Sequence, residues 1–167
     1  QVLEALSDKL RFSISATTRP KRKGEADGKD YYFMSEEEFK AKIQEDAFIE
    51  WAKVHQHYYG TLKSEVERIV NDGYYVLLDL DVQGGYSIKK IYPNAHLIYI
   101  IPPSMEELKR RLAGRNTDDA EAMRVRFENA VSEMKFKDDY PYQVINNDQQ
   151  IAFEELKYII THIVEKN

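Results

Sequence analysis

The sequence predicts an α/β protein in which a parallel sheet is flanked by helices. Residues 74–80 form a largely apolar run that is typical of a strand buried on both faces. Asp79 lies near the end of this run and Asp81 directly follows it. The chain then passes through a glycine pair into a helical pattern, as in an α/β crossover. A second apolar strand is predicted over 95–101, and the apolar spacing of 151–163 predicts a helix that packs on the sheet. Because ligands of such sheets bind beyond the carboxyl ends of the strands, we expect Asp79 and Asp81 to lie near one.

Length and composition predict a single domain over residues 1–167. A chain of 167 residues with 43% hydrophobic and 12% aromatic residues can bury a core. Its 29 acidic residues exceed its 24 Lys and Arg residues, and the formal charge of −5 disfavours sequence-independent binding to nucleic acid. The absence of cysteine excludes disulfides and thiolate metal sites. No apolar run approaches the ~20 residues that span a bilayer, so we expect a cytoplasmic protein with neither nucleic acid nor a membrane as its partner.

Local patterns predict the remaining elements. Apolar residues within 1–10 have roughly helical spacing with no start signal ahead of them, which predicts the end of a helix. Short strands are predicted over 12–15 and 31–33. A capping box that begins at Ser35 predicts a helix through about residue 45, and a second box at Ser104 begins another. Further helices are predicted over 62–72 and 119–139.

The segment from Ser15 to Glu25 has the composition of an anion-binding loop. Arg19 and Arg22 are three residues apart in a turn-rich stretch, and a guanidinium group binds phosphate bidentately at any working pH. Hydroxyl groups from Ser15 and Tyr31 would complete a site for a phosphate monoester. Taken alone, the residues favour a solvated basic loop, because lysines are interleaved with the arginines.

Glu50 is a carboxylate inside the otherwise apolar run 48–54. It is either exposed through strand alternation, opposite Ile49 and Trp51, or buried for a functional reason. His55 and His57 follow this run, but no third ligand lies at a usable spacing, so we interpret them as surface residues rather than a metal pair.

Six motifs resemble, in order, those of the guanylate kinase family. They are S-A-T-T-R-P-x-R-x-G-E-x-D-G-x-D-Y from Ser15, F-I-E-W-A-x-V, Y-Y-G-T, L-L-D-L-D-V-Q-G, P-P-S and L-x-x-R-L-x-x-R. The resemblance covers almost every residue from Phe12 to the C-terminus. It implies a P-loop kinase fold with an inserted GMP-binding region, within about 12–80, and a helical lid with flanking helices over about 105–139. The implied activity is ATP-dependent phosphorylation of GMP to GDP, with Mg²⁺ accompanying ATP.

The resemblance also assigns residues to GMP. Glu50 matches a glutamate that accepts hydrogen bonds from two guanine donors that adenine does not present. Thr61 matches a hydroxyl, often a serine, that reads the guanine oxygen, and Tyr59 matches a tyrosine at the phosphate. We expect Glu25 to orient the two loop arginines. The whole implied GMP-binding set is Ser15, Arg19, Arg22, Glu25, Tyr31, Glu50, Tyr59, Thr61 and Asp81.

Phosphoryl transfer is implied to depend on arginines that arrive on a closing lid. Taken alone, arginines on charged helices are ordinary solvated residues. The resemblance to nucleoside monophosphate kinases implies instead that they stabilise the transferred charge while closure excludes water. Asn116 stands where the family usually has glycine in this lid. The implied catalytic residues are Arg111, Arg115, Arg126 and Asp81.

The ATP side of the site is implied by a further segment. Asn147 and Asp148 match residues that meet the donor adenine, and Asp79 matches a position near the metal, where it would support Mg²⁺ indirectly. No protein side chain is expected to bind the metal directly.

One family motif, the G-x-x-x-x-G-K-[ST] phosphate loop, is expected ahead of the Ser15 motif, and eleven residues precede Phe12 here. We expect this loop upstream of Gln1, and little turnover by residues 1–167 without it. An alternative is a guanylate-kinase-like module that binds phosphopeptides; Asp81 and the lid arginines favour the enzyme. A monophosphate kinase for another base is a third reading, against which Glu50 and Thr61 argue.

Overall fold

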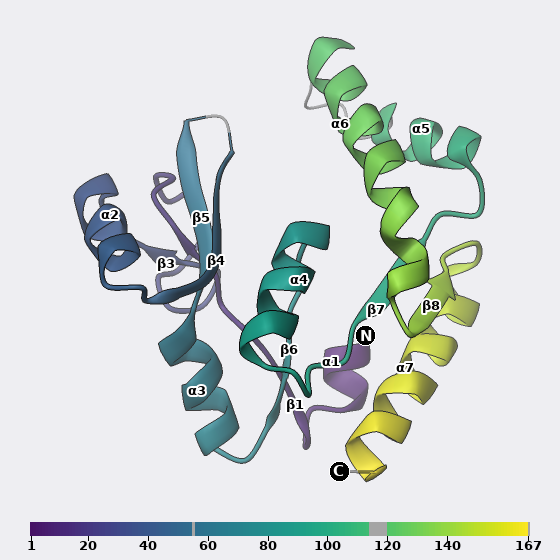
Figure 1. Ribbon diagram of the computed structural model, residues 1–167, viewed down its shortest axis with the longest axis horizontal. Coiled ribbons are helices and arrows are strands. Elements are labelled where there is room, and N and C mark those ends of the chain that lie inside the picture. The colour runs from purple at the N-terminus through teal and green to yellow at the C-terminus, as the bar shows by residue number, and fades with distance from the viewer. Residues whose placement is uncertain (55, 114–119, 167) are drawn as a thin grey trace. The chain divides into compact units, whose positions relative to one another are not determined.

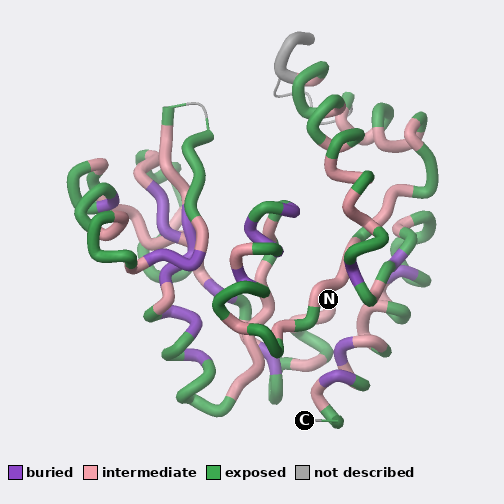
Figure 2. Tube along the Cα trace, in the orientation of Figure 1, coloured by how far each residue is buried: buried purple, intermediate pink, exposed green. Residues whose placement is uncertain are grey.

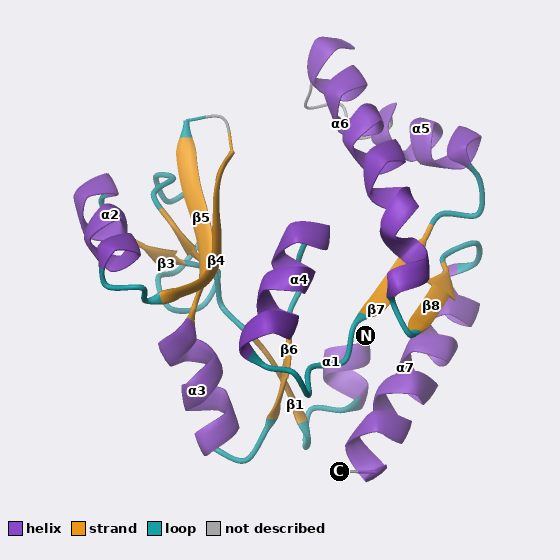
Figure 3. Cartoon of the chain, viewed as in Figure 1, coloured by secondary structure: helices purple, strands orange, loops and turns teal. Residues whose placement is uncertain are grey.

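The computed structural model describes residues 1–54, 56–113 and 120–166, which fall into two compact units. One unit comprises Leu3–Ala95, and the other comprises Gln1–Val2 with His96–Asn167. Figure 1 labels most helices and strands of both units, and Figure 3 colours the elements by type. Each unit contains a pair of parallel strands with helices beside them. The predicted α/β class with parallel strands flanked by helices is therefore confirmed.

In the Leu3–Ala95 unit, strand β1 (Leu10–Phe12) pairs in parallel with β6 (Tyr75–Leu77). Both strands differ from their predicted bounds: β1 begins two residues before 12–15, and β6 is shorter than 74–80. The pairing explains the short β6, because its partner offers three residues and Ser13 adds one further bond, from its N–H to the Leu77 oxygen at 3.0 Å. Helix α3 (Lys63–Asn71) contacts β6, while α1 (Val2–Ala5) precedes β1 in the chain and α4 (Val82–Ile91) follows β6.

A four-stranded sheet carries the central part of the same unit. Its strand order is β3-β2-β5-β4, with β2 and β3 parallel and the other two pairs antiparallel. The register of β4 and β5 shifts between Phe48 and Glu50, so the strand carries an irregularity where it leaves the buried core. The strands are β2 (Ala16–Thr17), β3 (Tyr32–Phe33), β4 (Phe48–Val54) and β5 (His57–Leu62).

Helix α2 (Glu36–Gln44) closes one face of this sheet. The predicted capping box is present: Ser35 accepts from the Glu38 N–H, and the Glu38 carboxylate accepts from the Ser35 N–H at 2.8 Å. Phe39 is fully buried and stacks on Phe48 with ring centroids 4.3 Å apart. Figure 2 shows buried positions within this sheet, and others on α3, α4 and α7.

In the other unit, β7 (Ile98–Ile101) pairs in parallel with β8 (Tyr142–Ile145). The predicted long helix is α6 (Ala120–Glu133), which continues as a 3-10 helix, η1 (Met134–Asp139). Among the described helices, none has the length and apolar composition needed to cross a bilayer. The other helices of this unit are α5 (Met105–Ala113) and α7 (Gln149–Lys166).

Candidate functional site

The loop after β2 is organised around an ion pair between Arg19 and Glu25. Arg19 Nη2 donates to Glu25 Oε1 at 2.7 Å, while the second carboxylate oxygen accepts from the Arg22 N–H at 2.7 Å. Hydrogen bonding from Arg19 holds the pKa of Glu25 below its usual range, and the same bond raises the pKa of Arg19. One carboxylate thus holds the Arg19 guanidinium group and the backbone of Arg22. That Glu25 orients both arginines toward a ligand stays a prediction.

Aromatic rings surround the Arg19 guanidinium group. Its carbon lies 5.4 Å from the Tyr31 ring centroid and 5.7 Å from that of Phe33, within the range of cation–π attraction. Tyr59 meets Tyr31 edge to face at 6.2 Å. The Arg19 side chain is only 11% exposed. Arg19, Tyr31 and Tyr59, which the family resemblance assigns to one phosphate, therefore lie close together.

The loop is anchored to β5 by threonine hydroxyls. Thr17 Oγ1 donates to the Tyr58 oxygen at 2.9 Å and accepts from the Arg19 N–H at 3.1 Å, and Thr18 Oγ1 accepts from the Tyr58 N–H at 2.9 Å. Ser15 lies just before β2 and is partly buried, whereas Arg22 is exposed. The backbone of the loop is thus fixed at its base, with Arg22 nearer the solvent.

Glu50 and Thr61 form a second polar pair, on adjacent strands of the sheet. They are register partners in β4 and β5, and the Thr61 hydroxyl donates to Glu50 Oε1 at 2.6 Å. Strict alternation would place Glu50 opposite Ile49 and Trp51, but Ile49 is buried, Trp51 is 46% exposed and Glu50 is partly buried. Burial raises the pKa of Glu50, as does the charge of Asp81, while the Thr61 hydroxyl lowers it.

The start of α4 approaches Glu50 closely. Asp81 is the N-cap of this helix and accepts from the Gly84 N–H at 2.8 Å. A Cβ on Gly84 would lie 3.0 Å from the Leu80 Cβ and 3.4 Å from the Glu50 Cγ, so the lack of a side chain permits the approach. Asp81 and Asp79 are both exposed, and Asp81 thus combines a structural cap with a place beside Glu50.

The predicted lid residues lie in the other unit, and part of the lid falls outside the described residues. Arg111 on α5 donates through Nε to Glu107 Oε1 at 2.7 Å, and Arg110 binds the same carboxylate. These hydrogen bonds lower the pKa of Glu107 to about 2. Arg126 is exposed on α6. Arg115 and Asn116 are outside the described part of the chain.

The predicted ATP-binding pair follows β8. Asn147 donates its N–H to the Ile145 oxygen at 2.9 Å. Asp148 Oδ1 accepts from the N–H groups of Gln150 and Ile151 at 2.9 and 3.0 Å, so it caps helix α7. The carboxylate therefore has a structural task at the start of this helix.

Sequence reasoning missed a buried carboxylate, Glu65 on α3, which is only 3% exposed. It accepts hydrogen bonds from Tyr32 and Arg68. The available signal was its spacing, because position 65 falls on the same helix face as Leu62 and Ile69, where a charged residue is unusual.

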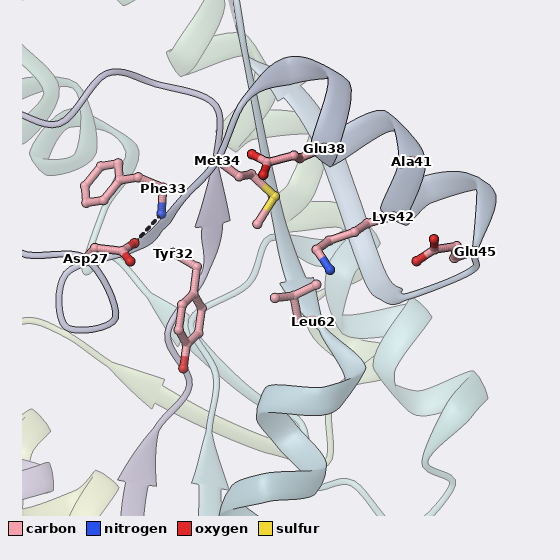
Figure 4. Close-up of a pocket in the computed structure, with 9 residues that line it drawn as sticks. All are labelled: Asp27, Tyr32, Phe33, Met34, Glu38, Ala41, Lys42, Glu45 and Leu62. Atoms are coloured by element: carbon pink, nitrogen blue, oxygen red, sulfur yellow. Dashed lines mark hydrogen bonds between the residues drawn. The ribbon is translucent and has the colours of Figure 1, made fainter.

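A pocket of about 450 Å³ lies between β3, α2 and the end of β5. Figure 4 shows its mixed lining, with the Glu38 carboxylate beside the Met34 side chain and the Lys42 amine beside Leu62. Within the described residues, no group of three or more acidic or histidine side chains is placed to hold a metal ion. The pocket is lined by Asp27, Tyr32, Phe33, Met34, Glu38, Ala41, Lys42, Glu45 and Leu62.

Comparisons with known proteins agree over nearly the whole chain. A family model described as guanylate kinase matches residues 1–163. A guanylate kinase of Caldanaerobacter subterraneus is 48% identical over 168 residues, covering 99% of this chain and 81% of that relative. A guanylate kinase of Thermotoga maritima is 47% identical over 160 residues, covering 96% and 77%. The crystal structure of guanylate kinase from Anaplasma phagocytophilum matches with a TM-score of 0.73 at 34% identity, covering 99% of this chain and 79% of that one.

Proposed function

The chain belongs to the guanylate kinase family, and from that membership we propose how its residues hold GMP and assist phosphoryl transfer. Its reaction is the ATP-dependent phosphorylation of GMP to GDP. The relatives compared above are guanylate kinases, and no observation favours the alternative of a phosphopeptide-binding module. The observation that carries the residue assignments is that two polar clusters, Arg19 with Glu25 and Glu50 with Thr61, lie in one compact unit.

The phosphate of GMP would bind at the first cluster. Arg19 is already paired with Glu25 and lies beside the rings of Tyr31 and Phe33, so little side-chain freedom is lost when it takes up a phosphate. Arg22 would supply a second guanidinium group from the solvent side, and bidentate pairing with phosphate oxygens suits both arginines. The hydroxyls of Ser15, Tyr31 and Tyr59 would donate the remaining hydrogen bonds.

The guanine base would bind at the second cluster. Guanine presents a ring N–H and an exocyclic amine side by side, and the Glu50 carboxylate can accept from both. Adenine offers no such donor pair, so it would leave a partly buried carboxylate unpaired, at a cost that provides discrimination. Asp81, beside Glu50, would add negative charge that favours the same donors.

Thr61 has a single hydroxyl proton, and this proton is donated to Glu50 in the structure. To read the guanine oxygen it must turn away from Glu50. The guanine N–H groups can replace the lost hydrogen bond at that moment, so the exchange leaves no carboxylate oxygen without a donor. Thr61 would thus hold Glu50 in position before GMP binds and contact the base afterwards.

Phosphoryl transfer would depend on arginines of the unit that contains residues 96–167. Arg111, Arg126 and Arg115 would supply positive charge as negative charge redistributes over the transferred phosphoryl group. Arg111 is held by Glu107, whose pKa is lowered to about 2 by hydrogen bonds from Arg110 and Arg111. Asn147 and Asp148 would lie near the adenine of ATP.

Magnesium would arrive bound to ATP. Mg²⁺ commonly keeps several waters and is held by substrate phosphates with one or two carboxylates, so it needs no dedicated protein cage. Asp79, exposed just after β6, fits an indirect role toward such a hydrated ion. When bound, the ion would neutralise phosphate charge during transfer.

We also propose that the enzyme works in the cytoplasm with GMP and ATP as its partners. The formal charge of −5 provides no general attraction for nucleic acid or for an anionic membrane surface.

Calorimetric titration with GMP, AMP and guanosine, alongside a coupled assay of ADP release, tests these assignments. We expect saturable binding of GMP, weaker binding of guanosine because it lacks the phosphate, and no turnover of AMP. Arg19→Gln should weaken GMP and leave guanosine unchanged, whereas Glu50→Gln should weaken both. If both variants bind GMP like the unmodified protein, the two clusters do not form the GMP site.

A further inference from the structure

Glu65 has a network of contacts that the proposed mechanism does not use. Its side chain is 1% exposed, and Oε2 accepts from the Tyr32 hydroxyl at 2.8 Å. Arg68, one turn further along α3, binds both carboxylate oxygens at 3.0 Å in the bidentate manner. Ile14 donates its N–H to Oε1 at a longer 3.5 Å. Burial alone would raise the pKa of Glu65, but hydrogen bonds from Arg68 and Tyr32 outweigh it and hold the pKa below its usual range.

Stabilisation of the fold does not by itself explain why a buried, paired carboxylate stands at position 65. Withdrawing a carboxylate from water is costly, and well-packed apolar residues often replace buried ion pairs without loss of stability. Leu62 and Ile69 show that this face of α3 already packs apolar side chains. A carboxylate with three directed contacts differs from an apolar residue mainly in fixing the positions of its partners.

The partners of Glu65 lie next to the residues that would bind the GMP phosphate. Ile14 directly precedes Ser15, and Tyr32 directly follows Tyr31. The Tyr32 N–H also donates to the Ser15 oxygen at 2.9 Å, which joins the two segments to each other. Figure 4 shows the Tyr32 ring extending away from β3, with its hydroxyl at the far end from the strand. Through its contacts with Ile14 and Tyr32, Glu65 therefore links helix α3 to the segments that carry Ser15 and Tyr31.

We propose that Glu65 is a positioning residue for the GMP phosphate: it fixes Ile14 and Tyr32, and thereby Ser15 and Tyr31, and Arg68 balances its charge. This inference rests on the proposed function. It assigns Glu65 no contact with substrate. Its effect is confined to the phosphate end of GMP, because Glu50 and Thr61 lie on other strands and have their own hydrogen bond.

The test uses Tyr32→Phe and Glu65→Gln, singly and together, in the full chain. Tyr32→Phe removes one hydroxyl and leaves the Glu65–Arg68 pair in place, so it remains informative if Glu65→Gln folds poorly. Glu67→Gln is the matched control, because Glu67 is exposed on the same helix two residues away. Binding of GMP and guanosine is measured by calorimetry at a temperature where circular dichroism shows every variant folded, and KM and kcat are measured for GMP.

We expect Tyr32→Phe and Glu65→Gln each to raise the Kd and KM for GMP about three- to tenfold, the range for one coupled polar contact. Guanosine affinity and kcat at saturating GMP should be unchanged. The double variant should lose less GMP binding free energy than the sum of the losses in the two single variants. Glu67→Gln should behave like the unmodified protein. A lowered Tm with unchanged GMP affinity, or an equal loss of GMP and guanosine affinity, would overturn the positioning role.

Different results would show that the proposed GMP site itself, and not the role of Glu65, is wrong. If the unmodified protein bound neither GMP nor guanosine, or if Glu50→Gln left base preference unchanged, the proposed GMP site itself would be wrong. If the unmodified protein binds GMP with the expected base preference and only the Tyr32 and Glu65 variants lack their effects, the error is confined to Glu65.

Discussion

Replacing Glu50 with glutamine should change GMP affinity and protein stability in opposite directions. The amide keeps one acceptor oxygen for guanine but loses the charge, so at least one charge-assisted hydrogen bond is lost. Such a bond contributes about 1.5–3 kcal/mol, which corresponds to about 10- to 150-fold weaker binding of GMP. The discrimination between GMP and AMP should fall by a similar factor, because the unpaired carboxylate that penalises adenine is removed.

The stability effect follows from the raised pKa of Glu50. Burial makes its ionised form less favourable in the folded protein than in the unfolded chain, so the folded state binds more protons between the two pKa values. Stability therefore falls as pH rises through this window, and at neutral pH the ionised Glu50 opposes folding. Glu50→Gln should raise Tm at pH 7 and have a smaller effect below the pKa of an ordinary glutamate.

Calorimetric titration with GMP and AMP, with thermal unfolding at pH 7 and pH 4, measures both effects on the same samples. Trp51→Phe is a suitable control, because the neighbouring Trp51 is 46% exposed and carries no charge. Reduced GMP affinity together with a lower Tm at pH 7 would indicate a general packing defect and would refute the argument. Unchanged preference for GMP over AMP would refute the role of Glu50 in base recognition.

Variants at three further positions test other contacts of the proposed site. Thr61→Val removes the hydroxyl that lowers the pKa of Glu50, so calorimetry over a pH series should show GMP binding lost at a higher pH than in the unmodified protein, while Thr61→Ser should restore the original profile. Gly84→Ala places a Cβ 3.4 Å from the Glu50 Cγ, and kinetics with both nucleotides should show a higher KM for GMP and weaker rejection of AMP; an unchanged KM would show that the helix yields without moving Glu50. Glu25→Gln frees Arg19 from its ion pair, so titration should show weaker GMP binding with guanosine unaffected, and equal losses for the two ligands would contradict an orienting role at the phosphate.

Features that depend on adjacent residues were predictable from the sequence. The capping box at Ser35 needs only a serine and a glutamate three residues apart, and the structure has both of its hydrogen bonds. The link between Arg19 and Glu25 likewise closes within a seven-residue loop, although Glu25 was expected to orient the arginines through the family resemblance and not through its spacing. In these cases the partners are close in sequence, so closing the loop between them costs little chain entropy.

Features that depend on pairing between distant segments were not predictable in the same way. The extents of β1 and β6 are set by their mutual register, which neither segment encodes alone. The exposure of Trp51 beside buried Ile49 follows from the register shift between Phe48 and Glu50, since alternation would place both on one face. A single-sequence pattern assumes regular alternation, and an irregular residue in the strand invalidates that assumption from that residue onward.

Glu65 shows why a pattern can reveal a site without giving its purpose. Its place on an apolar helix face marks it as unusual, but the same sequence would fit a carboxylate that turns toward solvent. Its proposed role follows from its contacts with Tyr32, 33 residues earlier, and with Ile14, 51 residues earlier, both of which donate hydrogen bonds to the Glu65 carboxylate. Because both partners adjoin residues of the phosphate cluster, a substitution on α3 should change how the nucleotide phosphate is held without touching the nucleotide.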